Sequence, residues 1–114
     1  MMTWFKDETH KTRFNAMWRK AARPSDDLEW RSALYVLASI EKEGLSDCIQ
    51  DGYIDFDALY QLSDGWSTSE KALVKLAHDL YNGKGGITVH QLFRDLDEDN
   101  ARVALEGLRL RYFD

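Results

Sequence analysis

Histidine is the side chain most easily recruited as an acid, a base or a metal ligand near neutral pH, and the chain has three, His10, His78 and His90. Only His78 has a carboxylate next to it in the sequence, that of Asp79. Both residues lie in a segment with helical spacing, where neighbouring side chains point about 100° apart and are poorly placed to form a hydrogen-bonded dyad. We favour a structural role for the pair. The alternative is a small ligand-binding or hydrolase domain that uses His78, Asp79 and nearby carboxylates.

Metal and cofactor chemistry have no signature in this sequence. The chain lacks HExxH, CxxC and GxSxG motifs, and its single cysteine, Cys48, has no partner for a disulfide within the chain. The run 84–86, Lys-Gly-Gly, lacks the spacing of a phosphate-binding loop and is interpreted as a turn. We therefore expect no metal site and no cofactor.

Trp66 is a further candidate for binding, because it stands in a glycine-containing loop just before a predicted helix. Two interpretations are open: the indole closes the core from the loop, or it presents an aromatic anchor to a partner. The first is favoured. Trp66, His78 and Asp79 together form the set of candidate binding residues.

Acidic residues gather at 26–29, 55–57 and 95–99, in each case before or at the start of a predicted helix. Carboxylates at such positions accept hydrogen bonds from free backbone N–H groups and oppose the positive end of the helix dipole. Helix capping is therefore a simpler explanation for these clusters than paired acid–base catalysis.

The elements that position these residues are mostly helical, because apolar residues recur at helical spacing between Gly, Pro and Ser signals. The sequence predicts an all-α or mainly α fold, a compact bundle of about five to six helices. The expected helices span about 8–22, 28–43, 55–62, 68–82, 91–96 and 99–112.

One internal similarity bears on how these helices are arranged. Gly52 and Ile54 have counterparts 33 residues later in Gly85 and Ile87, and each set is followed by a Leu-aromatic pair. One interpretation is a degenerate pair of EF-hand-like units, in which Ile54 and Ile87 form a minimal two-strand bridge. The other is that the same turn chemistry occurs twice. Neither loop has the oxygen ligands that calcium requires, so no calcium site is predicted.

Composition indicates a single globular domain over residues 1–114, with 44% hydrophobic and 31% charged residues. A net charge of −5 argues against general nucleic-acid binding, which needs clustered cations to displace phosphate counterions. No apolar run reaches membrane-spanning length and no secretion signal is recognised, so we expect a cytoplasmic protein that does not associate with membranes.

One group of segments is distinctive, namely Phe5-Lys6-Asp7 with His10, and residues 31–35, 65–69, 76–83 and 108–112. These segments resemble a family of small uncharacterised bacterial proteins, a domain of unknown function found in Gram-positive bacteria and their mobile elements. The resemblance implies a single domain but assigns no activity. The sequence thus favours a small acidic non-enzymatic protein-interaction module with an unknown protein partner, in an unknown oligomeric state.

Overall fold

The computed structural model describes residues 3–113. Helices account for 68% of the structure, which confirms the mainly helical fold expected from the sequence. The α-helices are α1 (Glu8–Ala21), α2 (Leu28–Ala38), α3 (Phe56–Leu62), α4 (Thr68–Asn82), α5 (Val89–Arg94) and α6 (Glu98–Tyr112). Two 3-10 helices, η1 (Leu45–Cys48) and η2 (Ser63–Gly65), and the strands β1 (Ile49–Gln50) and β2 (Tyr53–Ile54) connect them.

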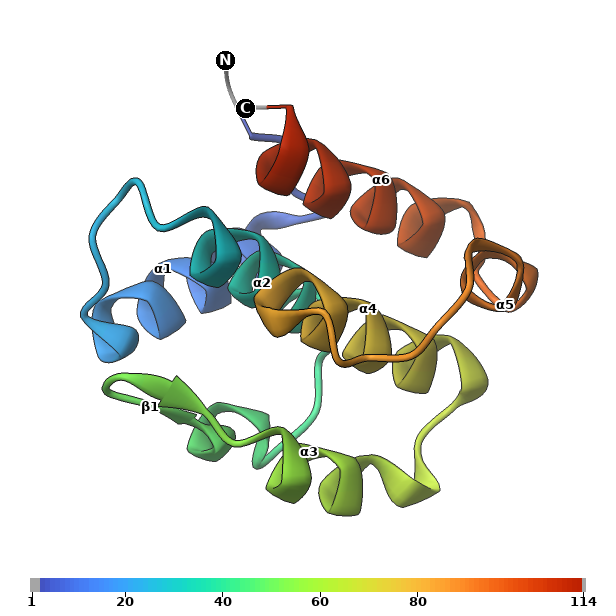
Figure 1. The fold of residues 1–114 in the computed structure, drawn as a ribbon, viewed down its shortest axis with the longest axis horizontal. Coiled ribbons are helices and arrows are strands. Elements are labelled where there is room, and N and C mark those ends of the chain that lie inside the picture. The colour runs from blue at the N-terminus through green and yellow to red at the C-terminus, as the bar shows by residue number, and fades with distance from the viewer. Residues whose placement is uncertain (1–2, 114) are drawn as a thin grey trace.

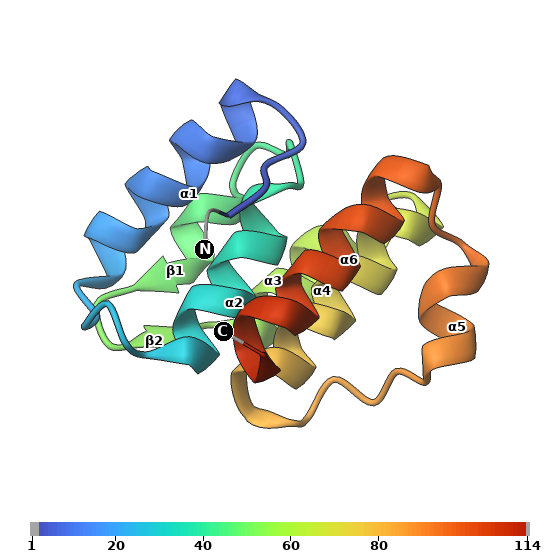
Figure 2. The same ribbon diagram turned by 90° about the horizontal axis from the view of Figure 1, so that it is seen from above.

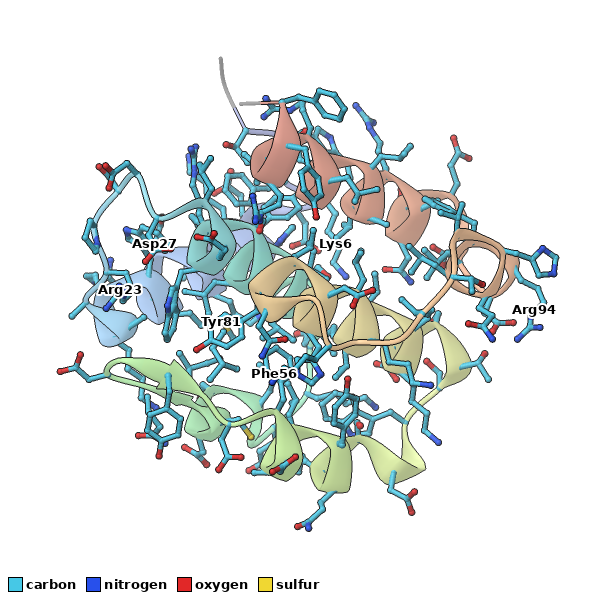
Figure 3. The ribbon with its side chains drawn as sticks, viewed as in Figure 1. Lys6, Arg23, Asp27, Phe56, Tyr81 and Arg94 are labelled. Atoms are coloured by element: carbon cyan, nitrogen blue, oxygen red, sulfur yellow. The ribbon has the colours of Figure 1, made fainter. Side chains whose placement is uncertain are left out.

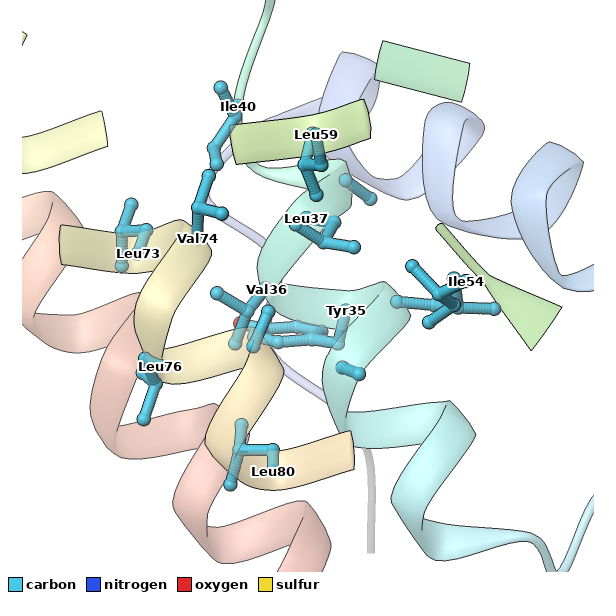
Figure 4. Packing of buried hydrophobic residues seen from close by; sticks show 14 of the residues in the cluster. Tyr35, Val36, Leu37, Ile40, Ile54, Leu59, Leu73, Val74, Leu76 and Leu80 are labelled. Carbon is cyan, nitrogen blue, oxygen red and sulfur yellow. The ribbon is translucent and has the colours of Figure 1, made fainter. Parts of the chain in front are cut away.

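The central element is α2, in which every residue from 32 to 38 is buried. A helix that is apolar all round must be covered on all sides, and α1, α4 and α6 pack around it (Figures 1 and 2). Figure 4 shows Val36 of α2 next to α4, the helix that carries Leu76 and Leu80, within the same buried cluster. The core of the molecule therefore lies around α2.

Gly107 lets α6 approach this centre closely. A Cβ atom at this position would lie 2.7 Å from Cγ2 of Val36 and 3.3 Å from Cδ1 of Leu80. The first distance is shorter than packed carbon atoms tolerate. The absence of a side chain at Gly107 is thus what allows α6 to lie against α2 and α4.

Helix starts follow the capping pattern expected from the sequence. Ser67 and Glu70 form a capping box at the start of α4, and Thr88 and Gln91 form a second one that starts α5 at Val89, two residues earlier than predicted. Carboxylates cap the other four helices, each accepting the backbone N–H three residues on: Asp7, Asp27, Asp55 and Asp97. The acidic clusters thus contain the residues that start helices.

The second helix is shorter than predicted: α2 ends at Ala38 and not near Gly44. The carbonyl oxygen of Ala38, which a longer helix would use, instead accepts a hydrogen bond from Nε of Arg13 at 2.7 Å. The hydroxyl of Ser39 donates to the carbonyl of Val36 at 2.6 Å. Donors from Arg13 of α1 and from Ser39 therefore satisfy backbone carbonyl groups at the end of α2.

The two-strand bridge exists, but its predicted partners are wrong. Ile54 pairs with Ile49 in an antiparallel hairpin, not with Ile87, which lies in an extended segment outside the sheet. Only residues 51 and 52 separate the strands, and Gly52 supplies the positive φ of 94° that such a tight turn needs. A two-residue loop costs little chain entropy to close, so Ile54 pairs with its near neighbour Ile49. Ile87 takes no part in this sheet, and the two Gly-containing segments therefore do not form an EF-hand-like pair.

Gly52 and Gly85 serve different needs, a positive φ at the first and a close approach to α4 at the second. The counterparts that share a role are Asp55 and Thr88, which cap the starts of α3 and α5.

Candidate functional site

The three candidate residues do not converge, because His78 and Asp79 lie on α4 whereas Trp66 precedes that helix. Trp66 directly follows η2 and precedes the capping residue Ser67, at the beginning of the helix. His78 and Asp79 stand in its last turns, about 15 Å further along the axis at 1.5 Å per residue. The residues therefore belong to separate environments.

His78 is half-buried against α3. Its Nδ1 lies 2.8 Å from the hydroxyl of Tyr60, and its ring stacks on Phe56 with the centroids 4.2 Å apart. Desolvation by burial is the main effect on both polar groups: it lowers the pKa of His78 and raises the pKa of Tyr60. The pair is therefore held as a neutral imidazole and a neutral phenol near pH 7.

Aromatic rings continue from His78 towards α2. Phe56 packs on Tyr81 with the centroids 5.6 Å apart, and Tyr81 meets Trp30 edge to face at 5.4 Å. Figure 3 labels Phe56 and Tyr81, which lie near each other between α3 and α4. His78 is thus one member of an aromatic contact between three helices, which is a packing role.

Asp79 holds the loop that follows α4. Its Oδ1 accepts backbone hydrogen bonds from Gly85 at 2.7 Å and from Gly86 at 3.3 Å. Gly85 passes so close to α4 that a Cβ atom would collide with the carbonyl oxygen of Lys75 and lie 2.9 Å from the nitrogen of Asp79. The carboxylate and the glycine together fix the loop at residues 83–86, called the 83–86 turn below, against the helix.

Trp66 is half-buried and packs against the hydrophobic core from its loop. Its backbone N–H donates to the carbonyl of Ser63 at 2.9 Å, which closes η2. This placement favours the interpretation in which the indole covers the core over the one in which it anchors a partner.

Within residues 3–113, no three His, Cys, Asp or Glu side chains are grouped so that they could hold a metal ion. Of the histidines, His10 is fully buried and contacts α2, whereas His90 is exposed on α5. Cys48 is buried, and burial raises the pKa of its thiol, which disfavours the reactive thiolate. No helix among the described residues has the length and apolar character of a membrane span.

The structure has two surface features that were not predicted from the sequence. The first, called the α5–α6 face, consists of Val89, Phe93, Leu105, Leu108 and Tyr112, and most of these residues line a hollow of about 230 Å³. The second, called the α1 groove, is a hollow of about 480 Å³ between α1 and residues 40–46. Both have a sequence signal. Leu105, Leu108 and Tyr112 recur at helical spacing on α6, as do Arg13, Met17 and Lys20 on α1.

A family model matches the chain over residues 1–114, and its description is Family of unknown function (DUF6075). The match confirms the resemblance to a domain of unknown function. No curated protein and no solved structure matches the chain. The geometry of the described residues is therefore the basis for any functional assignment.

Proposed function

We propose that this chain, which belongs to the Family of unknown function (DUF6075), is a non-enzymatic protein-interaction module that binds its partner through the α5–α6 face. The observation that carries this proposal is the exposure of large apolar side chains on that face. Val89 is 74% exposed, Leu105 58% and Tyr112 59%. Contiguous exposed apolar surface on a small protein is typical of a docking site.

The distribution of exposed apolar residues makes this face distinct from the remaining described surface. Six large hydrophobic side chains are exposed among residues 3–113, and three of them, Val89, Leu105 and Tyr112, belong to this face. Tyr53 and Leu62 stand singly in β2 and α3, and Phe113 follows the end of α6. Isolated apolar residues are ordinary on protein surfaces, whereas a cluster around a hollow offers pockets for a partner's anchor residues.

Charge indicates the chemistry of the partner. Asp95, Asp97, Glu98 and Asp99 lie between the end of α5 and the first turn of α6, and Arg94 pairs with Asp95 at 3.4 Å. Residues 89–113 hold five carboxylates and four arginines, a net charge of −1, and the whole chain carries −5. A partner segment with apolar anchors and neighbouring basic residues is complementary to this surface, and opposite charge accelerates its association. We assign the face to such a segment.

The alternative, a ligand-binding or hydrolase domain that uses His78 and Asp79, has less support. Nδ1 of His78 is engaged with Tyr60, and Oδ1 of Asp79 holds the 83–86 turn. Trp66 lies at the other end of α4. A hydrolytic site needs a nucleophile and a base within hydrogen-bonding reach of each other and of the substrate, and these residues are used in packing.

The proposal includes the setting in which the module acts. A single buried cysteine and an acidic surface suit a reducing compartment and argue against general binding to nucleic acids. We propose the cytoplasm as its compartment, in a bacterium as the family resemblance implies, with a protein as its partner.

Site-specific photo-crosslinking in the native host tests this proposal. Leu105, Tyr112 and, as the control, the exposed Tyr53 are each replaced by a photoreactive phenylalanine analogue. We expect the same covalent adduct from positions 105 and 112 and none from position 53. The substitution Val89→Asp, on the same face, should abolish the adduct.

The peptide joined to position 105 should carry apolar residues and neighbouring lysine or arginine. Equal adducts from all three positions would indicate non-specific contact and overturn the proposal. So would the absence of an adduct at 105 and 112. An adduct made of two copies of this chain would show that the face is a self-association surface and not the site of a different partner.

A further inference from the structure

The α1 groove has an aliphatic floor. Met17 of α1, Ile40 and Leu45 lie at 5%, 3% and 1% exposure and form the base of the hollow, with Ala16 at its edge. No aromatic ring is among the residues that line it. Its volume of about 480 Å³ falls within the range of small-molecule sites, roughly 300–1,000 Å³. The floor is thus suited to an alkyl chain, and Met17 adapts its shape easily.

Three cations surround this floor, although the chain as a whole is acidic. Arg13, Lys20 and Lys42 line the groove, against a single lining carboxylate, that of Glu43. The local charge of the lining is therefore positive, whereas the chain carries −5. A concave site of one sign attracts ligands of the opposite sign, and its apolar floor strengthens that attraction.

Backbone contacts hold two of the cations in place. Nε of Arg13 donates to the carbonyl of Ala38 at 2.7 Å, and Nζ of Lys20 donates to the carbonyl of Ser46 at 2.7 Å. Arg13 also forms a long ion pair, with NH1 lying 3.9 Å from Oε1 of Glu41, whose side chain is 80% exposed, so solvent weakens this pair. Neutral carbonyl groups orient these cations without cancelling their charge.

The third cation is less strongly fixed. Nζ of Lys42 lies 3.7 Å from Oε1 of Glu70, and the Lys42 side chain is 39% exposed. An exposed pair at that distance contributes little and exchanges readily with a ligand. Lys42 can therefore turn towards an anion bound in the groove.

We propose that the α1 groove binds a small aliphatic carboxylate, with the alkyl chain on the floor formed by Met17, Ile40 and Leu45 and the carboxylate at the cationic rim. The groove is separate from the α5–α6 face, so this site does not depend on the proposed protein-interaction function. Charge complementarity selects an anionic ligand over a cationic one, and the aliphatic floor suits an alkyl chain.

Titration of the ¹⁵N-labelled protein with decanoate, followed by NMR, tests the site. We expect saturable shifts of the amides of residues 13–20 and 40–46, with a dissociation constant below about 1 mM. Hexanoate should bind at least about tenfold more weakly because it buries fewer methylene groups. Decanol should also bind at least about threefold more weakly than decanoate because it lacks the charge.

Matched variants locate the ligand. Ala16→Phe fills the groove from an exposed helix position and should weaken decanoate binding more than about tenfold. Asn15→Phe adds the same bulk to the neighbouring exposed position, outside the groove, and should leave binding unchanged. Lys20→Gln should weaken it about threefold to tenfold, whereas Lys11→Gln, on the same helix, should have less than about a twofold effect.

Melting temperatures of all four variants establish that they are folded, so a change in binding reports on the groove. Three results would overturn the proposal. The first is the absence of saturable shifts in these amides. The second is equal binding of decanol and decanoate, which would remove the role of the cations. The third is equal weakening by Ala16→Phe and Asn15→Phe, which would place the ligand elsewhere.

Discussion

The imidazole of His10 in α1 donates its Nε2 hydrogen to the carbonyl oxygen of Tyr35 in α2, across 2.8 Å. The other ring nitrogen fixes this tautomer, because Nδ1 accepts the backbone N–H of Lys6 at 3.2 Å. The ring is fully buried and packs against the rings of Phe5 and Tyr35. A neutral histidine thus joins the segment before α1, α1 itself and the central helix.

Acidification should destabilise the protein through His10. Desolvation by burial lowers the pKa of this side chain from 6.5 to about 4, so the folded state binds the proton less readily than the unfolded state. The contribution to stability is complete above the unfolded pKa and decreases as the pH falls towards the folded pKa. We expect His10 to contribute about 2 kcal/mol to the fall in the free energy of unfolding between pH 7 and pH 5, with a further contribution of the same sign from His78.

Urea denaturation at several pH values measures this drop. His10→Gln should be less stable at pH 7 and should lose most of the pH dependence between pH 7 and pH 5. His90→Gln is the control, since His90 is exposed, and should behave like the wild type. Parallel pH profiles for the wild type and His10→Gln would contradict the assignment.

The β1–β2 hairpin predicts coupling between two isoleucines. Ile49 and Ile54 lie opposite each other and are 0% and 5% exposed. Each substitution by Ala should lower the free energy of unfolding by about 2–4 kcal/mol. The double mutant should depart from the sum by more than about 0.5 kcal/mol.

Ile87→Ala supplies the control for this double-mutant cycle, because Ile87 lies outside the sheet. Its effect should add to that of Ile54→Ala within about 0.5 kcal/mol. Chemical denaturation of the single and double mutants decides between the two pairings. Coupling of Ile54 to Ile87, with additivity between Ile49 and Ile54, is incompatible with the observed register.

Gly85→Ala should destabilise the protein by at least about 2 kcal/mol, because the new Cβ would collide with the carbonyl oxygen of Lys75 on α4. The matched control is Gly65→Ala, where a Cβ meets nothing within 4 Å, and its effect should stay within about 0.5 kcal/mol. Thermal and urea unfolding measure both variants. Equal stability of the two would show that the 83–86 turn does not pack on α4 as described.

Gly107→Ala should also be destabilising, although alanine is the better helix former by about 1 kcal/mol. The new Cβ would lie 2.7 Å from Cγ2 of Val36, a β-branched side chain fixed in the core, and overpacking costs about 1–3 kcal/mol. We expect a net loss of about 1 kcal/mol. Val36→Ala removes the clashing methyl group, so the double mutant should be more stable than the sum of the single effects by at least about 1 kcal/mol.

The free energy of unfolding of the two single mutants and the double mutant, measured in urea, tests this compensation. Strict additivity would mean that α6 does not rest on Val36, and a gain in stability from Gly107→Ala alone would mean that helix propensity outweighs packing there.

The sequence by itself determined the helical class and most helix starts, because these depend on neighbours within a few residues. Asp7 accepts the N–H of His10 three positions on, and Ser67 and Glu70 cap each other across the same spacing. Asp51-Gly52 is the same kind of local signal, since this dipeptide favours the two-residue turn that joins the strands of Ile49 and Ile54.

Tertiary structure alone decided the end of α2, the burial of His10 and the shape of the two surface sites. Arg13 and Ala38 are 25 positions apart, yet their hydrogen bond accompanies the end of the second helix. His10 becomes neutral and structural only because Tyr35 and Phe5 exclude water from it. Helical periodicity predicts which residues share a face, but not which face another element covers. Contacts between segments distant in sequence decide which faces are covered, and in this fold they leave the α5–α6 face and the α1 groove uncovered.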